Sequence, residues 1–186
     1  DPGISVVAEA ANGNEVLEVA RSQSVDVVVV DITMPGKSGL DTLKELKKLQ
    51  PRLPVIVLSM HPSDQYAVRV LRAGAAGYLT KESAPGELVK AIKKAYRGDK
   101  YISEEVAELL AGYIQNSGDE DPHKKLSDRE YEVLVSLGSG KSVSQTSAEM
   151  FLSVKTVSTY RSRIIEKTGL QSNAEMTRYC IERKLY

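Results

Sequence analysis

The stretch Val27-Val28-Val29-Val30-Asp31-Ile32-Thr33-Met34-Pro35-Gly36 decides the fold of this chain. Four consecutive β-branched, apolar residues are typical of a short strand in a parallel sheet, buried on both faces. The strand ends on the carboxylate of Asp31, and Pro35-Gly36 turns the chain away. Ligands of open α/β sheets bind beyond the carboxyl ends of the strands. Asp31 is therefore a candidate functional residue, although a single Asp at such a place is more often a turn residue.

The bulk composition is that of a globular protein. The 186 residues suffice for one large or two small domains, and 41% are hydrophobic and 27% charged. No apolar run has the length of a membrane span, so we expect a cytoplasmic protein without a membrane partner. The single Cys180 fits a reducing compartment and is expected to be a small core residue. The first residue is Asp rather than Met, which suggests that a segment precedes it.

Charge divides the chain into two parts. Residues 1–123 hold 14 Lys+Arg and 18 Asp+Glu, a balance of −4. Residues 124–186 hold 11 and 7, a balance of +4, although the whole chain has a formal net charge of zero. An acidic N-terminal part and a basic C-terminal part indicate two domains, the second of which is suited to bind a polyanion.

The first part alternates between strand and helix patterns. Apolar runs predict strands over 5–8, 25–31, 54–59 and 77–80. Stripes of helical spacing predict helices over 16–23, 40–49, 66–74 and 85–98. The order βαβαβαβα predicts an α/β fold with a parallel sheet.

Three of these strands are followed by polar residues that suit phosphoryl chemistry. Asp31 is a carboxylate nucleophile, Ser59 a hydroxyl donor and Lys81 an ammonium. Parallel strands share a direction, so all three side chains are expected at one edge of the sheet. Taken alone, these residues can be explained without a function. A hydroxyl such as that of Ser59 is common at the end of a strand, and Tyr78, in the next strand, suits an amphipathic strand edge.

The joint pattern resembles the receiver domain of bacterial two-component response regulators. The matching residues are Asp31 with Met34-Pro35 and Gly39, then Ser59, then Tyr78-Leu79-Thr80-Lys81, within about residues 1–97. The resemblance implies a flavodoxin-like fold in which a partner histidine kinase phosphorylates Asp31. It also implies that Ser59 and Lys81 contact the phosphoryl oxygens and that Tyr78 moves inward on activation.

One departure from the receiver pattern concerns the metal. Receivers begin with a strand that ends in an acidic pair, followed by a helix, and the pair helps to bind Mg²⁺. This strand and helix are missing here, so the resemblance leaves only Asp31 and the backbone carbonyl of Thr33 as Mg²⁺ ligands. The missing strand would lie between the strands predicted over 5–8 and 25–31, and its absence predicts an apolar gap in the sheet.

Residues 98–123 are predicted to be a linker with one helix that starts near Tyr101-Ile102, with Ser103 as its N-cap. The stretch 116–122 (NSGDEDP) is polar and rich in turn residues, which favours a flexible tether.

The last part, 124–186, predicts four short helices. Ser127 to Glu130 and Ser172 to Glu175 have the spacing of capping boxes, and Leu152-Ser153 predicts a turn and a new N-cap. A tight turn before a polar, basic third helix is typical of helix-turn-helix DNA binding. Charged residues on a single helix more often form a solvated face. The interpretation as a DNA-binding domain therefore rests on the pattern of the whole segment.

That segment resembles the LuxR-type helix-turn-helix domain. The resemblance rests on Leu126–Glu130, Gly140–Ser142, Ser153–Val157 and Lys167–Leu170, and the chain departs from the family pattern at Thr146, Ser147, Tyr160 and Arg163. It implies base contacts from Ser158, Thr159 and Ser162. It implies phosphate contacts, which position the helix, from Lys155, Thr156, Arg161 and Lys167.

These observations predict a response regulator of the NarL/FixJ type, not an enzyme, in which the receiver controls the DNA-binding domain. Its expected partners are a histidine kinase, double-stranded DNA and a second copy, and Mg²⁺ is the expected cofactor. Two alternatives remain open: a phosphorylation-independent DNA-binding regulator with a degenerate receiver, and a flavodoxin-like enzyme with an accessory helical domain.

Two other motifs are excluded. Gly140-Lys141-Ser142 is not a P-loop, because Val135 stands where that motif needs Gly. His61 and His123 are too few for a metal cluster.

Overall fold

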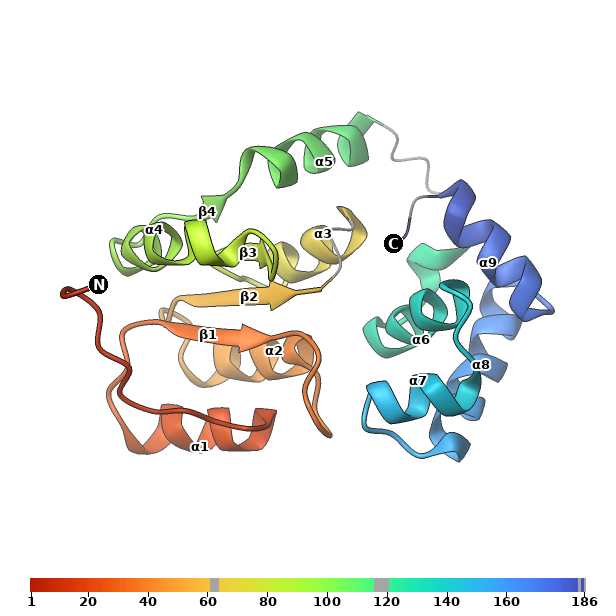
Figure 1. The fold of residues 1–186 in the computed structure, drawn as a ribbon, viewed down its shortest axis with the longest axis horizontal. Coiled ribbons are helices and arrows are strands. Elements are labelled where there is room, and N and C mark those ends of the chain that lie inside the picture. The colour runs from red at the N-terminus through yellow and green to blue at the C-terminus, as the bar shows by residue number, and fades with distance from the viewer. Residues whose placement is uncertain (61–63, 116–120, 184, 186) are drawn as a thin grey trace. The chain divides into compact units, whose positions relative to one another are not determined.

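The computed structural model describes residues 1–60, 64–115, 121–183 and 185, and it divides into two compact units, Asp1–Ala111 and Gly112–Tyr186 (Figure 1). The division falls inside the segment predicted as the linker. Most of the predicted tether, residues 116–120, and His61 lie outside the described residues.

The first unit is built on a parallel sheet of four strands in the order β1 (Val28–Asp31), β2 (Val55–Ser59), β3 (Gly77–Thr80) and β4 (Tyr101–Ile102). The sheet and its alternation with helices confirm the predicted α/β receiver fold. Tyr101-Ile102 was predicted to start a helix and instead extends the sheet as β4, which pairs with Gly77 and Tyr78. Ser103 then caps the following helix as predicted, since its hydroxyl accepts a hydrogen bond from Val106 N at 3.3 Å.

In the described part of the chain, four helices lie within this unit: α1 (Gly13–Ser22), α2 (Gly39–Leu49), α3 (Asp64–Arg72) and α4 (Ala84–Tyr96). A further helix, α5 (Glu104–Gln115), contains the boundary between the two units. Helices α1 and α2 pack together on one side of the sheet, and α4 lies on the other (Figure 1). On the α4 side, Ile56 and Leu79 are buried against Ala91 and Ala95. Both faces of β2 and β3 are therefore covered, as a parallel sheet requires.

The prediction of a strand over residues 5–8 is wrong. No strand or helix forms there, and the side chains of Val6 and Val7 are 76% and 59% exposed. Residues with β propensity form a strand only beside a partner strand. β1 is the edge of the sheet, and the gap predicted from the sequence separates it from residues 5–8, so these residues have no partner. The prediction that β1 is buried on both faces is also wrong. Val30 is buried, but Val29 is 37% exposed beside the same gap.

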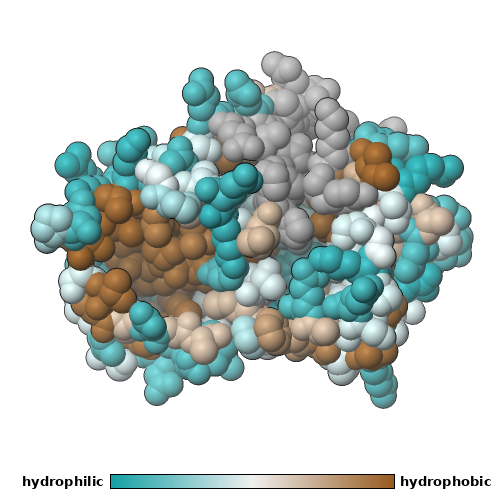
Figure 2. All heavy atoms as spheres, viewed as in Figure 1, coloured by the Kyte–Doolittle hydropathy of each residue, from teal (hydrophilic) through white to brown (hydrophobic). Residues whose placement is uncertain are grey.

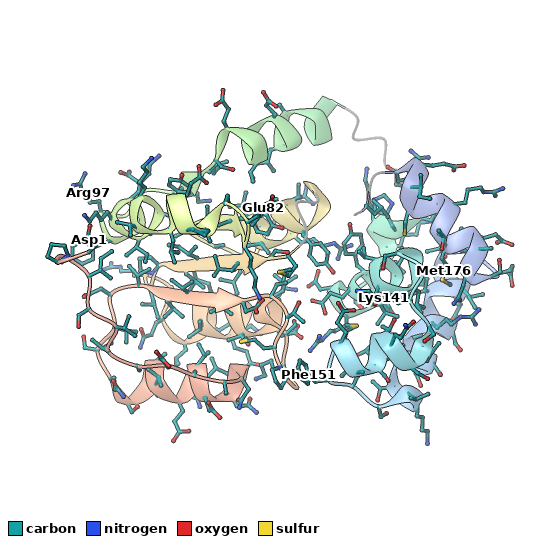
Figure 3. All side chains as sticks on the ribbon, in the orientation of Figure 1. Asp1, Glu82, Arg97, Lys141, Phe151 and Met176 are labelled. Atoms are coloured by element: carbon teal, nitrogen blue, oxygen red, sulfur yellow. The ribbon has the colours of Figure 1, made fainter. Side chains whose placement is uncertain are left out.

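The second unit is helical. It contains the 3₁₀ turn η1 (Pro122–Lys125) and the helices α6 (Asp128–Gly138), α7 (Val143–Glu149), α8 (Val154–Thr168) and α9 (Asn173–Glu182). Helix α6 packs against both α8 and α9, and Met176 of α9, labelled in Figure 3, is fully buried. This arrangement confirms the predicted small all-α domain.

Local signals set the helix ends of this unit. Ser127 and Glu130 form the predicted reciprocal capping box of α6, and Ser142 and Gln145 form one on α7. The box predicted at Ser172 and Glu175 is only half formed, because the Glu175 carboxylate accepts from Gln171 N, at 2.8 Å. None of the helices in the described ranges is long and apolar enough to cross a membrane.

Candidate functional sites

Polar side chains gather at the carboxyl edge of the sheet in the first unit, as predicted. Asp31 ends β1, Ser59 ends β2 and Lys81 follows β3, and the parallel register aligns these three ends. The backbone joins two of them, because Lys81 N donates to Ser59 O at 2.7 Å. The edge therefore presents a carboxylate beside an ammonium, with a hydroxyl on the strand between them.

Asp31 is held at both carboxylate oxygens. Its Oδ2 lies 2.5 Å from Lys81 Nζ, and its Oδ1 accepts a hydrogen bond from Thr33 N at 3.0 Å. The two side chains of the ion pair are 31% and 37% exposed, so the carboxylate is accessible from solvent. Such a charge-assisted contact sets a cation directly beside the Asp31 carboxylate.

The other two predicted residues of this edge are buried. Ser59 is fully buried at the end of β2, and Tyr78 is 1% exposed in the middle of β3, beside Val57. Tyr78 thus occupies an inward position in this structure. Movement of its ring stays a prediction, since a single conformation is described.

A close backbone approach fixes the position of Asp31. A Cβ on Gly39 would lie 2.2 Å from Asp31 O and 2.6 Å from Ile32 Cα, so the first turn of α2 sits directly against the end of β1. Gly39 N also donates to Ile32 O at 2.9 Å. The motif glycine at position 39 therefore lets a helix begin where any side chain would push the end of β1 away.

The residues present do not fit a Mg²⁺ site. Mg²⁺ prefers an octahedral shell that contains carboxylates and waters. In the part of the chain that the structure describes, no three His, Cys, Asp or Glu side chains come together as a metal site. Asp31 offers one carboxylate that is already paired with Lys81, and Thr33 offers one carbonyl.

In the second unit, the predicted base-reading residues share one open face of α8. Lys155, Ser158, Thr159 and Ser162 are all exposed and follow the i, i+3, i+4, i+7 spacing of a single helix face. Ser153 caps the helix, because its hydroxyl accepts from Thr156 N at 3.0 Å. Val157 and Ile164 point the opposite way into the core, so packing aims the polar face outward.

Two basic residues predicted to contact phosphates are engaged inside the unit. Lys167 Nζ lies 2.6 Å from the carboxylate of Glu130, a side chain that is only 3% exposed. Arg161 Nε donates to Asn173 Oδ1 at 3.0 Å, which ties α8 to the start of α9. Thr156 also takes part in the cap, with its hydroxyl 2.7 Å from Ser153 Oγ.

Sequence reasoning identified Glu130 as part of a helix cap but missed its contact with Lys167. Burial disfavours its charged form, but hydrogen bonds from Lys167 and Ser127 outweigh burial and lower the pKa of its carboxyl. The capping-box spacing identified the bond to Ser127, but Lys167 stands 37 residues away. Sequence spacing alone carries no signal for such a contact.

The turn between α7 and α8 has an unusual backbone. Phe151 has a φ of 54°, in the left-handed region, and its side chain is 56% exposed (labelled in Figure 3). Left-handed conformations cost non-glycine residues energy and occur mainly where the surroundings enforce them. The tight entry into α8 is the feature that enforces it here, with Leu152 N donating back to Ser147 O at 2.8 Å.

Comparisons with known proteins match a family to each of the two parts of the chain. Residues 1–93 match the response regulator receiver domain family, and residues 124–180 match the family of bacterial regulatory proteins of the luxR type. Response regulator UvrY of Escherichia coli K12 is 35% identical over 184 residues, which span 98% of this chain and 84% of UvrY. Response regulator GacA of Pseudomonas aeruginosa is 37% identical over 175 residues, 94% of this chain and 82% of GacA.

Solved structures give the same result for the fold. RcsB from Salmonella enterica serovar Typhimurium, bound to promoter rprA in the presence of phosphomimetic BeF3⁻, is 28% identical with a TM-score of 0.60, over 94% of this chain and 84% of that one. A LuxR-family two-component response regulator from Aurantimonas is 34% identical with a TM-score of 0.59, over 62% of this chain and 82% of that one. The chain therefore belongs to the NarL/FixJ-type response regulators, which join a receiver domain to a LuxR-type DNA-binding domain.

Proposed function

We propose that α8 binds double-stranded DNA in the major groove and that Asp31 is the phosphoacceptor through which a histidine kinase controls this binding. The observation that supports DNA binding most is the exposed face of α8, where Lys155 in the first turn is followed by three hydroxyl side chains. The first residues of a recognition helix are those that reach base edges.

The roles of the residues on this face follow from their chemistry. Ser158, Thr159 and Ser162 are the proposed sequence-reading residues, because their exposed hydroxyls can bond to base edges. The hydroxyls of Thr159 and Ser162 donate to Lys155 O and Ser158 O within α8, so these two read bases by accepting a hydrogen bond or by turning outward. Lys155 contacts a phosphate and sets the position of the helix. Thr156, Arg161 and Lys167 lie at the margin of this face, and their bonds inside the unit make any phosphate contact of theirs secondary.

RcsB has been solved as two dimers bound to two parallel DNAs, and we extend the dimeric arrangement to the present chain. Two copies would place two α8 helices on half-sites one helical turn apart. A regulator of this kind works beside the chromosome, in the cytoplasm. We assign it no enzymatic activity, in keeping with a family of DNA-binding regulators.

Base reading is tested by binding-site selection from a random duplex library, with the full chain and with Ser158→Ala and Ser162→Ala. We expect each substitution to change the preferred base at one position, at a cost of about 1–3 kcal/mol against the original site. Ser139→Ala is the matched control, because Ser139 follows α6 and its hydroxyl donates to Ser136 O. An unchanged preferred site in both α8 variants contradicts the proposed reading face.

The proposal for Asp31 rests on its ion pair with Lys81. A carboxylate oxygen attacks the phosphorus of the phosphodonor, the bond from phosphorus to the donor nitrogen or oxygen breaks, and an acyl phosphate remains on Asp31. In this proposal Lys81 Nζ, 2.5 Å from Oδ2, neutralises charge on the transferred group, and the Ser59 hydroxyl, which is buried at the end of β2, becomes accessible to contact another of its oxygens.

Labelling with a small phosphodonor such as acetyl phosphate tests this role, with the modified residue mapped by mass spectrometry. We expect Asp31→Asn to abolish labelling and Asp26→Asn, at the opposite end of the strand region, to leave it unchanged. Equal labelling of the Asp31→Asn protein refutes the assignment. Receiver domains generally use Mg²⁺, but the ligands present here fit it poorly, so we expect slow labelling that Mg²⁺ accelerates little.

The poor fit to Mg²⁺ supports a second candidate, DNA binding that does not depend on phosphorylation. In that case the Asp31–Lys81 pair stabilises the receiver rather than accepting a phosphoryl group. The two candidates differ in one measurement: DNA affinity before and after treatment with the phosphodonor. An Asp31-dependent change in affinity favours control by phosphorylation, and an unchanged affinity favours the second candidate.

A further inference from the structure

Val154 is an apolar residue in an exposed position at the start of α8. Its side chain is 51% exposed, whereas Val157 on the same helix is fully buried. On the face of the second unit that Figure 2 shows, teal and white residues prevail and brown, hydrophobic residues are scattered. Single exposed apolar residues are common on protein surfaces, so exposure alone gives Val154 no role. Its place on α8 and the chemistry of its neighbours point to one.

Val154 adjoins the face of α8 that we propose to read DNA. It is the first residue of the helix, directly after the cap in which Ser153 Oγ accepts from Thr156 N. Ser158 follows Val154 by four residues, so the two side chains are neighbours on the helix surface. Cα–Cβ bonds tilt toward the start of a helix, which places the Val154 side chain at the leading end of this face. The first residues of a recognition helix are those that reach base edges.

Much of the hydrogen-bonding capacity of this face is used inside the helix. Thr159 Oγ1 donates to Lys155 O at 3.0 Å. Ser162 Oγ donates to Ser158 O at 3.1 Å. A hydroxyl has one proton to donate, so in this conformation these two hydroxyls only accept bonds from base edges. Readout by hydrogen-bond donors is therefore limited on this face, and an apolar contact at its leading end adds to the readout.

In the major groove, thymine is the base that suits an apolar side chain. Thymine presents a C5-methyl group there, whereas guanine, adenine and cytosine are distinguished by hydrogen-bonding groups. Valine offers two γ-methyl groups, and because its χ1 angle is already stiff, contact with a base fixes little further freedom. The branched side chain of Val154 forms no hydrogen bond, but it has the shape and the apolar character to pack on a methyl group.

We propose that Val154 contacts the C5-methyl group of a thymine and thereby selects a T·A pair opposite the start of α8. This inference rests on the proposed binding of duplex DNA by α8 and adds a specificity-determining residue to it. An apolar surface of another protein is a poorer match to the same place, because the neighbours of Val154 on α8 are Lys155 and hydroxyl side chains, which suit phosphates and bases.

Uracil is the matched probe for this contact, because it has the hydrogen-bonding groups of thymine and lacks the methyl group. Without the methyl group, the contact removes about one CH₂ equivalent less of apolar surface from water. We therefore expect binding to weaken about fourfold when uracil replaces the contacted thymine.

The test begins with the site that the full chain prefers in a random duplex library. Each thymine of that site is replaced singly by uracil, and affinities are measured by fluorescence anisotropy for wild type, Val154→Ala and Val89→Ala. Val89→Ala is the matched control, because Val89 is also exposed, at 40%, but lies on α4 in the first unit. The comparison of thymine with uracil is made on wild type itself, so it does not depend on the folding of a variant.

We expect at least one thymine at which uracil weakens binding by wild type and by Val89→Ala about fourfold. Val154→Ala should bind the thymine and uracil duplexes equally at that position. A preferred site without thymine, no loss with uracil at any position, or the same loss in Val154→Ala overturns the inference. If binding stays salt-dependent in those cases, the proposed function stands without it, whereas an absence of salt-dependent binding to any duplex removes both.

Discussion

Replacing Lys167 with methionine isolates the ion pair that ties the end of α8 to the start of α6. Methionine keeps the apolar stem and removes the charge. The Glu130 carboxylate, 3% exposed, then loses a 2.6 Å bond and keeps the bond from Ser127 N at 2.8 Å. A hydrogen bond to a charged group contributes about 1.5–3 kcal/mol. The side chain of Lys167 is 39% exposed, so solvent already weakens the pair, and we expect a loss of about 2 kcal/mol at neutral pH.

The pH dependence of this loss has a definite sign. The pKa of Glu130 is lowered in the folded protein, so its contribution is fully present above the unfolded pKa of about 4.3 and disappears as pH falls through the folded value. The difference between wild type and Lys167→Met is therefore largest near pH 7 and shrinks below pH 4.

Hydrogen exchange of α6 and α8 peptides in the full chain measures this loss without requiring the two units to unfold together. Lys155→Met is the matched control, because Lys155 lies on the same helix but is exposed. We expect the control to leave exchange unchanged and to weaken DNA binding. If Lys167→Met leaves the protection of α6 intact and instead lowers the salt dependence of DNA binding, Lys167 serves as a phosphate contact and the reasoning about Glu130 fails.

Two further predictions concern the backbone. Gly39→Ala places a Cβ 2.2 Å from Asp31 O, and overpacking against backbone costs about 1–3 kcal/mol or more, so we expect a lower melting temperature of the receiver. Gly86→Ala in α4, where a Cβ meets nothing within 4 Å, should gain up to about 1 kcal/mol, and equal effects of the two changes contradict the close approach at Gly39. Phe151→Gly relieves a φ of 54° and should stabilise the second unit by up to about 1 kcal/mol in denaturant unfolding, whereas a loss would show that the exposed ring packs on something.

Much of the fold could be predicted from local pattern. The run of valines located β1, and the apolar stripes located the helices, because both signals depend only on neighbouring residues. The carboxyl edge with Asp31 and Lys81 followed from the parallel direction of the strands. Ser127 and Ser153 were identified as caps for the same local reason.

The failures of sequence reasoning all depend on distant partners. Residues 4–8 have strand composition, but strand formation needs a neighbouring strand that the chain does not provide. Tyr101-Ile102 was predicted to begin a helix, but it pairs with the edge of β3 and forms part of the sheet. The contact of Lys167 with the buried Glu130 could not be foreseen, because the two residues are far apart in sequence, and the phosphate contact of Lys167 stays a prediction.

The central claim, that the exposed face of α8 binds DNA through Lys155, is tested most directly by the salt dependence of duplex binding. Fluorescence anisotropy over a range of salt concentrations gives the slope of log K against log salt concentration, which reflects the number of phosphates neutralised. We expect salt-dependent binding by the full chain and a slope about 0.9 smaller in magnitude for Lys155→Met, whereas Lys48→Met in α2 leaves the slope unchanged. An absence of salt-dependent binding, or an unchanged slope in Lys155→Met, contradicts the account.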